Sequence, residues 1–197
     1  MHDNEKGPGS RGLFPFKDTH MFIDLIRNRR SVRRFKKQAV EPDKIDLLIE
    51  AALRSPSSRS LNPWEFIVVT DPAMLTDLST AKPHGATFLK NAPLGIVVIA
   101  DPEKCDVWIE DCSIAAIFIQ LAAQSMDLGS CWIQIRKRMH KDGGTAEAFV
   151  REKLNIPDRY CVLSIVAVGY PEERPKGHPK SSLSHDKVST GTYKADG

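Results

Sequence analysis

The chain carries a dense run of positive charge near its beginning. Residues 27–37, RNRRSVRRFKK, hold seven arginine and lysine residues and no acidic residue, although the net charge of the 197-residue chain is only +3. Guanidinium groups bind phosphates through charge-assisted, often bidentate hydrogen bonds. On a helical turn Arg29 and Arg33 would lie on the same side, with Ser31 between them. The run therefore predicts either a phosphate site or an exposed basic helix end stabilised by the helix dipole.

A second polar segment follows the basic run. Residues 55–64, SPSSRSLNPW, offer hydroxyl groups, an amide and turn-forming backbone just before the apolar run at residues 66–69. Serine, asparagine and proline favour turns because their side chains bond to nearby backbone or fix a backbone angle. Taken together, the basic run and this loop suggest a pocket for a phosphorylated, planar cofactor.

The pattern of apolar residues predicts an alternation of helices and strands that must position these segments. Apolar residues at three-to-four spacing indicate helices, and runs rich in β-branched residues indicate strands. Pro42 suits a first helical turn, and Pro56 disfavours helix in the residue before it. The pattern predicts helices at residues 21–30, 42–55, 72–80, 106–128 and 144–154, and strands at 65–70, 94–100, 130–133 and 160–169.

The predicted helix at residues 106–128 is apolar on more than one face. Cys112 and Ile119 belong to one apolar stripe, and Ile117 and Phe118 make a second face apolar as well. Such a helix is buried, either in the core of its own chain or against a partner chain. We favour a central helix at a dimer interface. The glycine that follows, Gly129, is predicted to end the helix in a left-handed cap.

The two ends of the chain differ in composition from its middle. Residues 1–18 are polar and rich in glycine and proline, with no apolar core of a signal peptide, so we expect a flexible arm and no secretory signal. Residues 19–197 suit a single domain. Within it, residues 171–197 have little to bury, so this tail is either disordered or laid on another surface. No apolar run approaches the ~20 residues that span a bilayer.

Cysteine and histidine usage argues against several other classes of site. The cysteines at positions 105, 112, 131 and 161 form no C-x-x-C pair, which favours reduced thiols in a cytoplasmic protein. The six histidines form no H-x-x-x-H pair, so no metal site is expected. Neither G-x-S-x-G nor a G-x-G-x-x-G after a strand occurs, so a hydrolase elbow and a Rossmann domain are unsupported.

Several motifs in this chain occur together in one known family. The chain resembles the FMN-dependent nitroreductases in its segments RRSVR, PSS, NPW, GSCWI and VGYPEE, which follow in the family's order at residues 29–33, 56–58, 62–64, 129–133 and 168–173. The resemblance implies an α+β, three-layer fold with a mixed, mostly antiparallel sheet flanked by helices. It also implies an intertwined homodimer with shared active sites, in which the C-terminal tail embraces the partner.

The resemblance further implies roles for residues of the basic run. Arg29 and Ser31 should contact the phosphate of FMN, with Arg30 beside them, its backbone more useful than its side chain. Arg33 should lie near the pyrimidine edge of the flavin, where a fixed cation stabilises the negative charge of the reduced ring. Lys180 in the tail matches one member of a basic pair that usually contacts the phosphate.

The remaining expected contacts concern the flavin ring. By the same resemblance, Pro56, Ser57 and Ser58 come from the other subunit and line the isoalloxazine ring. Asn62 is a candidate for contact with the ring's heteroatoms. Backbone around Ile133 and Gln134 should face the ring and could donate a hydrogen bond to N5.

Two departures from the family pattern affect these assignments. Ser60 and Asn62 stand where a common pattern has asparagine and then glutamine, so the ring contacts can differ. Ser182 stands in place of the second basic residue of the tail, which weakens the assignment of Lys180.

The activity implied is hydride transfer from NADH or NADPH, via FMN, to a nitroaromatic, a quinone or a similar small oxidant. Because both substrates would occupy one place in turn, the mechanism would be ping-pong. The cofactor carries the chemistry, so no catalytic side chain is expected. The expected partners are a second copy of the chain and the small oxidant, with no nucleic acid and no membrane.

Two alternatives remain open from the sequence. The first is other flavin chemistry on the same fold, namely reductive dehalogenation or dehydrogenation of a small metabolite. Enzymes of that kind carry lid insertions, for which residues 81–93 leave little room. The second is a basic nucleic-acid-binding module, which would bind DNA or RNA in a salt-sensitive way. The chain lacks a helix-turn-helix pattern or an aromatic platform beside the basic run.

Overall fold

The computed structural model describes residues 21–193, so the predicted arm at residues 1–18 lies outside the described part. At the centre is a four-stranded sheet with the order β1-β2-β4-β3. All three pairs of neighbouring strands are antiparallel. The strands are β1 (Trp64–Val69), β2 (Leu94–Ala100), β3 (Gly129–Gln134) and β4 (Cys161–Gly169).

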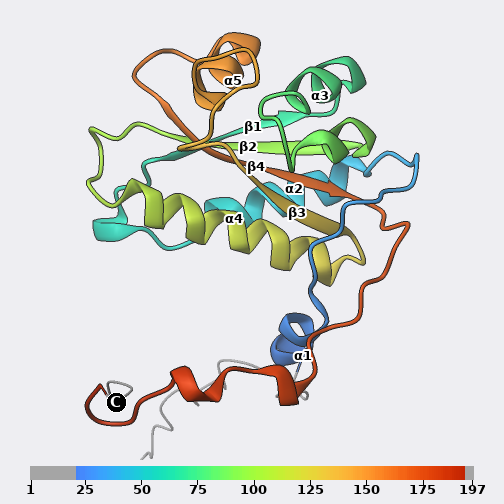
Figure 1. The fold of residues 1–197 in the computed structure, drawn as a ribbon, viewed down its shortest axis with the longest axis vertical. Helices are drawn as coiled ribbons and strands as arrows, with labels where there is room; N and C mark the ends of the chain where they lie inside the picture. Colours follow the sequence, from blue (N-terminus) through green and yellow to red (C-terminus); the bar gives the residue numbers. More distant parts are fainter. Residues whose placement is uncertain (1–20, 194–197) are drawn as a thin grey trace, which may run out of the picture.

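Helices cover both faces of this sheet (Figure 1). On one face lie α2 (Pro42–Leu53) and α4 (Trp108–Ser125), and on the other lie α3 (Pro72–Leu78) and α5 (Ala146–Leu154). The first helix, α1 (Met21–Asn28), lies below this body. Short 3-10 turns are found at Ser58–Ser60, Thr87–Asn91, Lys180–Ser182 and His185–Lys187.

Both faces of the central strand β2 are apolar, so helices must pack on both sides of the sheet. All of its residues are buried. Ile96 and Val98 belong to the core cluster with α2 and α4, whereas Val97 and Ile99 belong to the cluster with α3 and α5. A continuous apolar run is therefore used on both faces of one strand, as expected for a doubly covered sheet. The predicted α+β fold with three layers is confirmed.

The pairing within the sheet is more uniform than predicted. The sequence led us to expect a mixed sheet, but the four strands form a wholly antiparallel ladder. Among residues 21–193, the parallel pairing is an isolated bridge between Ser31 and Ser130. This bridge matters more for the site than for the sheet, because it attaches the basic run to the edge strand β3.

The prediction that Gly129 caps the long helix was wrong. Asp127 takes the left-handed conformation, with φ +60°. The backbone N–H groups of Asp127 and Leu128 then bond to the carbonyls of Gln124 and Ala123, which is a Schellman motif. Gly129 instead begins β3, where a Cβ would come within 2.8 Å of the Val32 side chain. Glycine is needed there for close approach, not for its backbone angles.

The first helix ends two residues earlier than predicted. Its last backbone bond joins the N–H of Arg29 to the carbonyl of Leu25 at 2.8 Å. Beyond it the chain turns to β3, where the N–H of Val32 donates to the carbonyl of Ser130 at 2.9 Å. Because the backbone groups are used across to another strand, the segment after Asn28 is extended and not helical.

The C-terminal tail runs back along this extended segment. The N–H of Lys36 donates to the carbonyl of Tyr170, and the N–H of Glu172 donates to the carbonyl of Arg34, both at 2.9 Å. Further along, a Cβ on Gly177 would stand 2.0 Å from the backbone oxygen of Arg27, so the tail touches the end of α1 directly. Whether this tail also embraces a partner stays a prediction, as does the single domain at residues 19–197.

The helices α1 and α4 both leave apolar side chains exposed. None of the residues of α1 is buried, and Met21, Phe22 and Ile26 are about half exposed, at 58%, 57% and 47%. On α4, the second face identified in the sequence stays partly open at Ile117 and Phe118. Much of α4 is buried within its own chain, and whether its open face meets a partner chain stays a prediction.

Candidate functional site

The basic run presents two different faces. In an extended segment successive side chains alternate, so Arg29, Ser31 and Arg33 share one side and Arg30 lies on the other. The guanidinium of Arg30 donates to the backbone oxygen of Lys176 in the tail. We paired Arg29 with Arg33 on the premise of a helix, and that premise was wrong. The two still share one side together with Ser31, because side chains two residues apart lie on the same face of an extended segment.

The side chains of Arg29, Ser31 and Arg33 lie near Cys131 on β3. Burial raises the pKa of the Cys131 thiol, while the charge of Arg33, a hydrogen bond with Ser31 and the charges of Arg29 and Lys82 act in the opposite direction. Burial therefore outweighs four groups that favour the thiolate. The thiol stays neutral at physiological pH, so the cations around it have no anion there to neutralise them.

Two cations that the sequence analysis did not single out join this group. Burial and the nearby charge of Arg138 lower the pKa of Lys82, while Cys131 opposes the shift. Lys82 follows α3 and stands alone in its loop, whereas Arg138 follows β3 and ends a short basic run at residues 136–138. Neither pattern differs from that of ordinary surface residues, so only the folded chain reveals that Lys82 lies near both Cys131 and Arg138.

We call Arg29, Arg33, Lys82 and Arg138 the cation cluster. Within residues 21–193 none of the four forms an ion pair with a carboxylate, whereas elsewhere Arg54 pairs with Glu50 at 2.7 Å. The guanidinium of Arg33 lies 5.9 Å from the centre of the Phe88 ring, which fixes its direction. The carboxylate of Glu173 is engaged by the backbone N–H of Arg33 at 2.9 Å. Like charges gathered without an ion pair create a positive site that favours an anionic ligand.

Beside the cluster lies the open edge of β3. The carbonyl of Ser130 accepts from the N–H of Val32, so the backbone groups of Ser130 point away from β4, toward the open edge. Since backbone groups alternate in an antiparallel strand, Gln134 also points its N–H outward, and Ile133 points its N–H toward β4. The Ile133 side chain is fully buried. Of the two residues proposed from the sequence, Gln134 offers the free backbone donor.

The second polar segment is a tightly bonded loop, which we call the serine loop (residues 55–62). The hydroxyl of Ser57 donates to the side-chain oxygen of Asn62 at 2.6 Å and accepts from the Asn62 backbone N–H at 3.0 Å. Arg59, Ser60 and Asn62 all have left-handed φ angles, between +47° and +55°. Such strain concentrates at functional sites because packing must hold it in place.

The serine loop is attached to the beginning of α4. The backbone N–H of Ser58 donates to a carboxylate oxygen of Asp111 at 2.9 Å, and Asp111 is buried in the first turn of that helix. The thiol of Cys105 contacts its other oxygen at 3.3 Å. Pro56 itself is exposed. The loop is thus held rigid while its proline faces outward.

One chain does not bring the serine loop to the cation cluster. Asp111 holds the serine loop at the first turn of α4. Ser130, which pairs with the extended segment at residues 29–33, follows the other end of that helix. The 18 residues of α4 span about 27 Å at ~1.5 Å per residue. Lys180 is likewise exposed in the tail, with no hydrogen bond or ion pair to the cluster in the described part of the chain.

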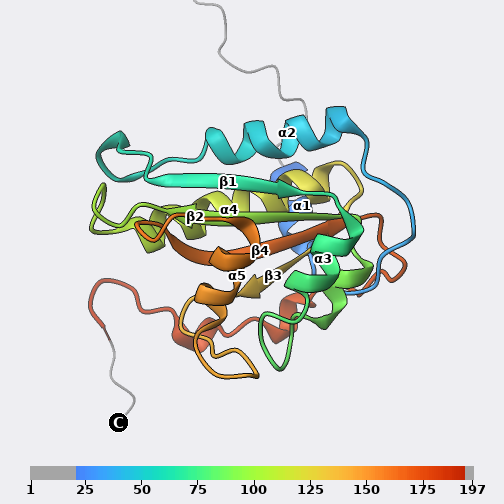
Figure 2. The same ribbon diagram turned by 90° about the horizontal axis from the view of Figure 1, so that it is seen from above.

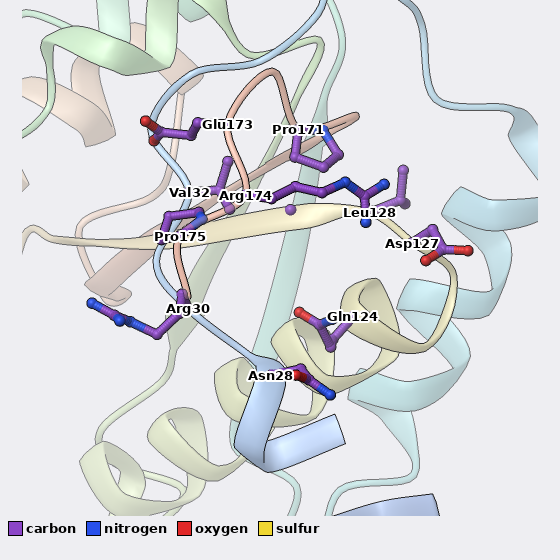
Figure 3. Close-up of a pocket in the computed structure, with 11 residues that line it drawn as sticks. Asn28, Arg30, Val32, Gln124, Asp127, Leu128, Pro171, Glu173, Arg174 and Pro175 are labelled. Carbon is purple, nitrogen blue, oxygen red and sulfur yellow. The ribbon is translucent and has the colours of Figure 1, made fainter. Parts of the chain in front are cut away.

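A pocket of about 350 Å³ occupies the opposite side of the basic run (Figure 3). It lies between the extended segment, the end of α4 and the tail, and Arg30 and Val32 contribute to its wall. The side chain of Arg174 extends across it toward Leu128, with Asp127 beyond. Because acids and cations alternate around this pocket, it is less suited to an anion than the cation cluster.

Neither a membrane-spanning helix nor a metal-binding cluster is found among residues 21–193. Among the described residues no helix has the length and apolar character required to cross a bilayer. Within the same range, no three His, Cys, Asp or Glu side chains gather in a way that could hold a metal ion.

Fold and site together define a class of protein: an α+β protein with positively charged side chains gathered between an extended arginine segment and the edge of a sheet. Comparison with known proteins places it more closely. The sequence model of the Nitroreductase family matches residues 26–85 and 76–170, and the chain belongs to that family.

Individual relatives agree with this placement. An FMN-dependent nitroreductase from Clostridium difficile has a structure that matches with a TM-score of 0.85 and 48% identity, covering 87% of this chain and 99% of that one. A protein of Archaeoglobus fulgidus, assigned the name NADH dehydrogenase/NAD(P)H nitroreductase, is 36% identical over 155 residues, which is 77% of this chain and 86% of the relative. The FMN reductase (NADPH) of Bacillus subtilis is 27% identical over 191 residues, covering 84% of this chain and 73% of that protein.

Proposed function

We propose that this chain is an FMN-dependent oxidoreductase that takes a hydride from NADH or NADPH and passes it to a nitroaromatic, a quinone or another small oxidant. Family membership supports the class of enzyme, and the names of its relatives support FMN and a nicotinamide nucleotide as cofactor and reductant. The observation in this chain that carries the proposal is the cation cluster, whose four side chains form no ion pair with a carboxylate among residues 21–193.

The residues of the cluster fit the two charged ends of FMN. Arg29 and the Ser31 hydroxyl would hold the phosphate by charge-assisted hydrogen bonds. Arg33, oriented by Phe88, and Lys82 would lie along the pyrimidine edge of the ring. A fixed positive charge there stabilises the negative charge of the reduced ring, and it does so more strongly in a site that excludes water.

Bound FMN would supply the hydride chemistry, and the protein would supply binding, orientation and charge. The outward backbone N–H of Gln134 would donate to the ring from the edge of β3. None of the side chains discussed above is placed as a nucleophile, since the Cys131 thiol is kept protonated by burial. Reductant and oxidant would use the same open face of the ring in turn, which corresponds to a ping-pong scheme.

We further propose a homodimer in which each site uses both chains. Since about 27 Å of α4 separates the serine loop from the cation cluster, the loop of one copy would complete the cluster of the other. Pro56, Ser57, Ser58 and Asn62 would then line the ring bound by Arg29 of the second copy. The exposed apolar faces of α1 and α4 would supply the buried area of such an interface.

The alternatives are less well supported. The segment between α3 and β2 is short and contains the 3-10 turn Thr87–Asn91, so it offers no large lid for reductive dehalogenation or a related reaction. Membership of an enzyme family disfavours a nucleic-acid-binding module. A cytoplasmic location stays part of the proposal, motivated by four free cysteines.

A mixing experiment tests the shared site. Arg29→Ala damages the phosphate contact, and Pro56→Trp places a large side chain on the exposed tip of the serine loop. Each variant alone should lose bound FMN and NAD(P)H oxidation. In a mixed dimer one site carries both substitutions and the other carries neither. After denaturation and refolding of an equal mixture, about a quarter of the wild-type activity should return, because half of the dimers are mixed.

The mixing result separates the two parts of the proposal. If each variant alone loses FMN but the mixture regains nothing, the site lies within one chain and the shared arrangement is wrong. If purified wild-type protein is colourless and binds no added FMN, the proposed enzyme function itself is wrong. Absorbance of flavin released on denaturation gives the occupancy in every sample.

A further inference from the structure

A separate pocket next to the cation cluster is lined by lysines and hydroxyl groups. It has a volume of about 320 Å³. Its wall is formed by the end of α3, the loop that follows, the 3-10 turn Thr87–Asn91 and the loop before α5. The lining residues are Thr76, Ser79, Thr80, Lys82, Pro83, Thr87, Lys90 and Lys141, and none is acidic. We call it the lysine pocket.

The three lysines come from three different segments of the chain. Figure 2 shows the loop after α3 and the loop before α5 side by side. Within residues 21–193, Lys82, Lys90 and Lys141 form no ion pair with a carboxylate. Folding has therefore collected three like charges at one place, which is unfavourable unless an anion binds there.

Two acids close in sequence to the pocket residues form contacts elsewhere. Asp77 lies in α3, but its carboxylate accepts from the ammonium of Lys153 at 3.0 Å. Asp142 follows Lys141, but its side chain is 74% exposed and lies 4.0 Å from the imidazole of His140. Both acids are thus directed toward other partners, and the lysine ammonium groups remain available to a ligand.

The hydroxyl groups narrow the chemistry of that ligand. Thr76, Ser79 and Thr80 donate their hydroxyl protons to helix carbonyls at 2.8, 2.7 and 2.7 Å. The donors left in the pocket are then mainly the ammonium groups of the lysines. Ammonium groups act as point charges toward phosphate oxygens, so the pocket suits a phosphate better than a neutral polar group.

Lys82 connects this pocket with the cation cluster. It lines the pocket, and it also lies close enough to Cys131 and Arg138 for their charges to affect its pKa. A ligand with a planar group over the cluster could therefore reach the lysine pocket with its phosphates. A nicotinamide dinucleotide has this form: a planar reacting ring joined to phosphates through a ribose.

We propose that the lysine pocket binds phosphate groups of the nicotinamide dinucleotide that reduces the enzyme. This inference rests on the proposed function and extends it from the cofactor to its reductant. Both dinucleotides contain a pyrophosphate, whereas only NADPH carries a 2′-phosphate, and either group meets the chemistry of the pocket. Lys90 and Lys141, which lie outside the cation cluster, are the residues that separate reductant binding from FMN binding.

The test compares Lys90→Ala, Lys141→Ala and the double variant with Lys187→Ala, an exposed tail lysine as control. KM and kcat are measured with NADPH and with NADH, and the Kd values of NADP⁺ and NAD⁺ are measured by calorimetry. Each substitution should raise KM and Kd about tenfold, since it removes a charge-assisted bond to phosphate. FMN content and kcat should stay at the wild-type level, and Lys141→Arg should restore most of the affinity.

The outcomes distinguish the two phosphates. A loss confined to NADPH and NADP⁺ assigns the pocket to the 2′-phosphate, and an equal loss with both nucleotides assigns it to the pyrophosphate. Unchanged constants in the double variant overturn the inference. The calorimetry also distinguishes failure of this inference from failure of the proposed function. A wild-type protein that contains no FMN refutes the enzyme assignment, whereas its binding of NADP⁺ still reports on the lysine pocket.

Discussion

Neighbouring arginines on opposite faces of one extended segment provide a stringent test of the phosphate site. Arg29 and Arg30 carry the same charge and are adjacent in sequence. Arg29 points toward Cys131 and forms no ion pair within residues 21–193, whereas the guanidinium of Arg30 is bound to the backbone of Lys176. We expect Arg29→Ala to weaken FMN binding strongly and Arg30→Ala to leave it nearly unchanged.

The expected size of the effect follows from the contacts. A hydrogen bond to a charged group contributes about 1.5–3 kcal/mol, so loss of the Arg29 contact should raise the Kd of FMN by roughly 10- to 150-fold. Without FMN, Arg29→Ala removes no ion pair that the described residues contain. The free energy of unfolding of the apoprotein should then change by about 0.5 kcal/mol or less. Arg30→Ala should free the tail near Lys176.

The assay is a titration of apoprotein with FMN, followed by quenching of flavin fluorescence, with thermal unfolding of the same apoprotein as the folding control. Limited proteolysis of the tail reports on Arg30. If both variants bind FMN with the wild-type Kd, or if Arg30→Ala weakens binding as much as Arg29→Ala, the alternation of faces does not determine the phosphate site. The reasoning from the extended segment would then be refuted.

Two further predictions concern the packing behind the site. Gly129→Ala should push the extended segment away from β3, because the new Cβ would lie 2.8 Å from Val32. We expect weaker FMN binding and a lower melting temperature. As the control, Gly143→Ala has open space around its new Cβ and should leave FMN binding unchanged. Burial, with a smaller effect of Asp111, raises the pKa of Cys112 to about 12. Since the folded pKa exceeds the unfolded one, Cys112 stabilises the fold fully below pH ~9, and up to roughly 4 kcal/mol is lost as the pH rises toward 12. Alkaline unfolding should be shallower in Cys112→Ala, and equal slopes would contradict the shift.

Elements with strong local patterns were predictable from the sequence. The strand at residues 94–100 was predicted with its observed ends, because an apolar run of that length serves a sheet covered on both faces. The helix that begins at Pro42 was also predictable from its proline and its apolar spacing. In both cases the residues that decide the structure are neighbours in sequence.

Features that depend on distant contacts were not predictable in the same way. Gly129 has the position of a helix cap in sequence, and only the approach of Val32 explains the glycine. The segment after Asn28 continues a helical pattern, yet its backbone bonds to Ser130 make it extended. Lys82 carries no local pattern, and Arg138 ends a short basic run that looks like ordinary surface. Their part in the site depends on how their two loops meet, with Lys82 near Cys131.

The long helix α4 acts as a spacer in the proposed dimer. One end holds the serine loop through Asp111, and the other leads directly into the strand that anchors Arg29. If the dimer is two-fold symmetric, the helix length sets how far apart the two flavins lie, because every chain contributes one end to each of them. Lengthening α4 by one turn would move the serine loop and the cation cluster of one chain about 5.4 Å further apart, so both half-sites would lose their fit to their counterparts at once.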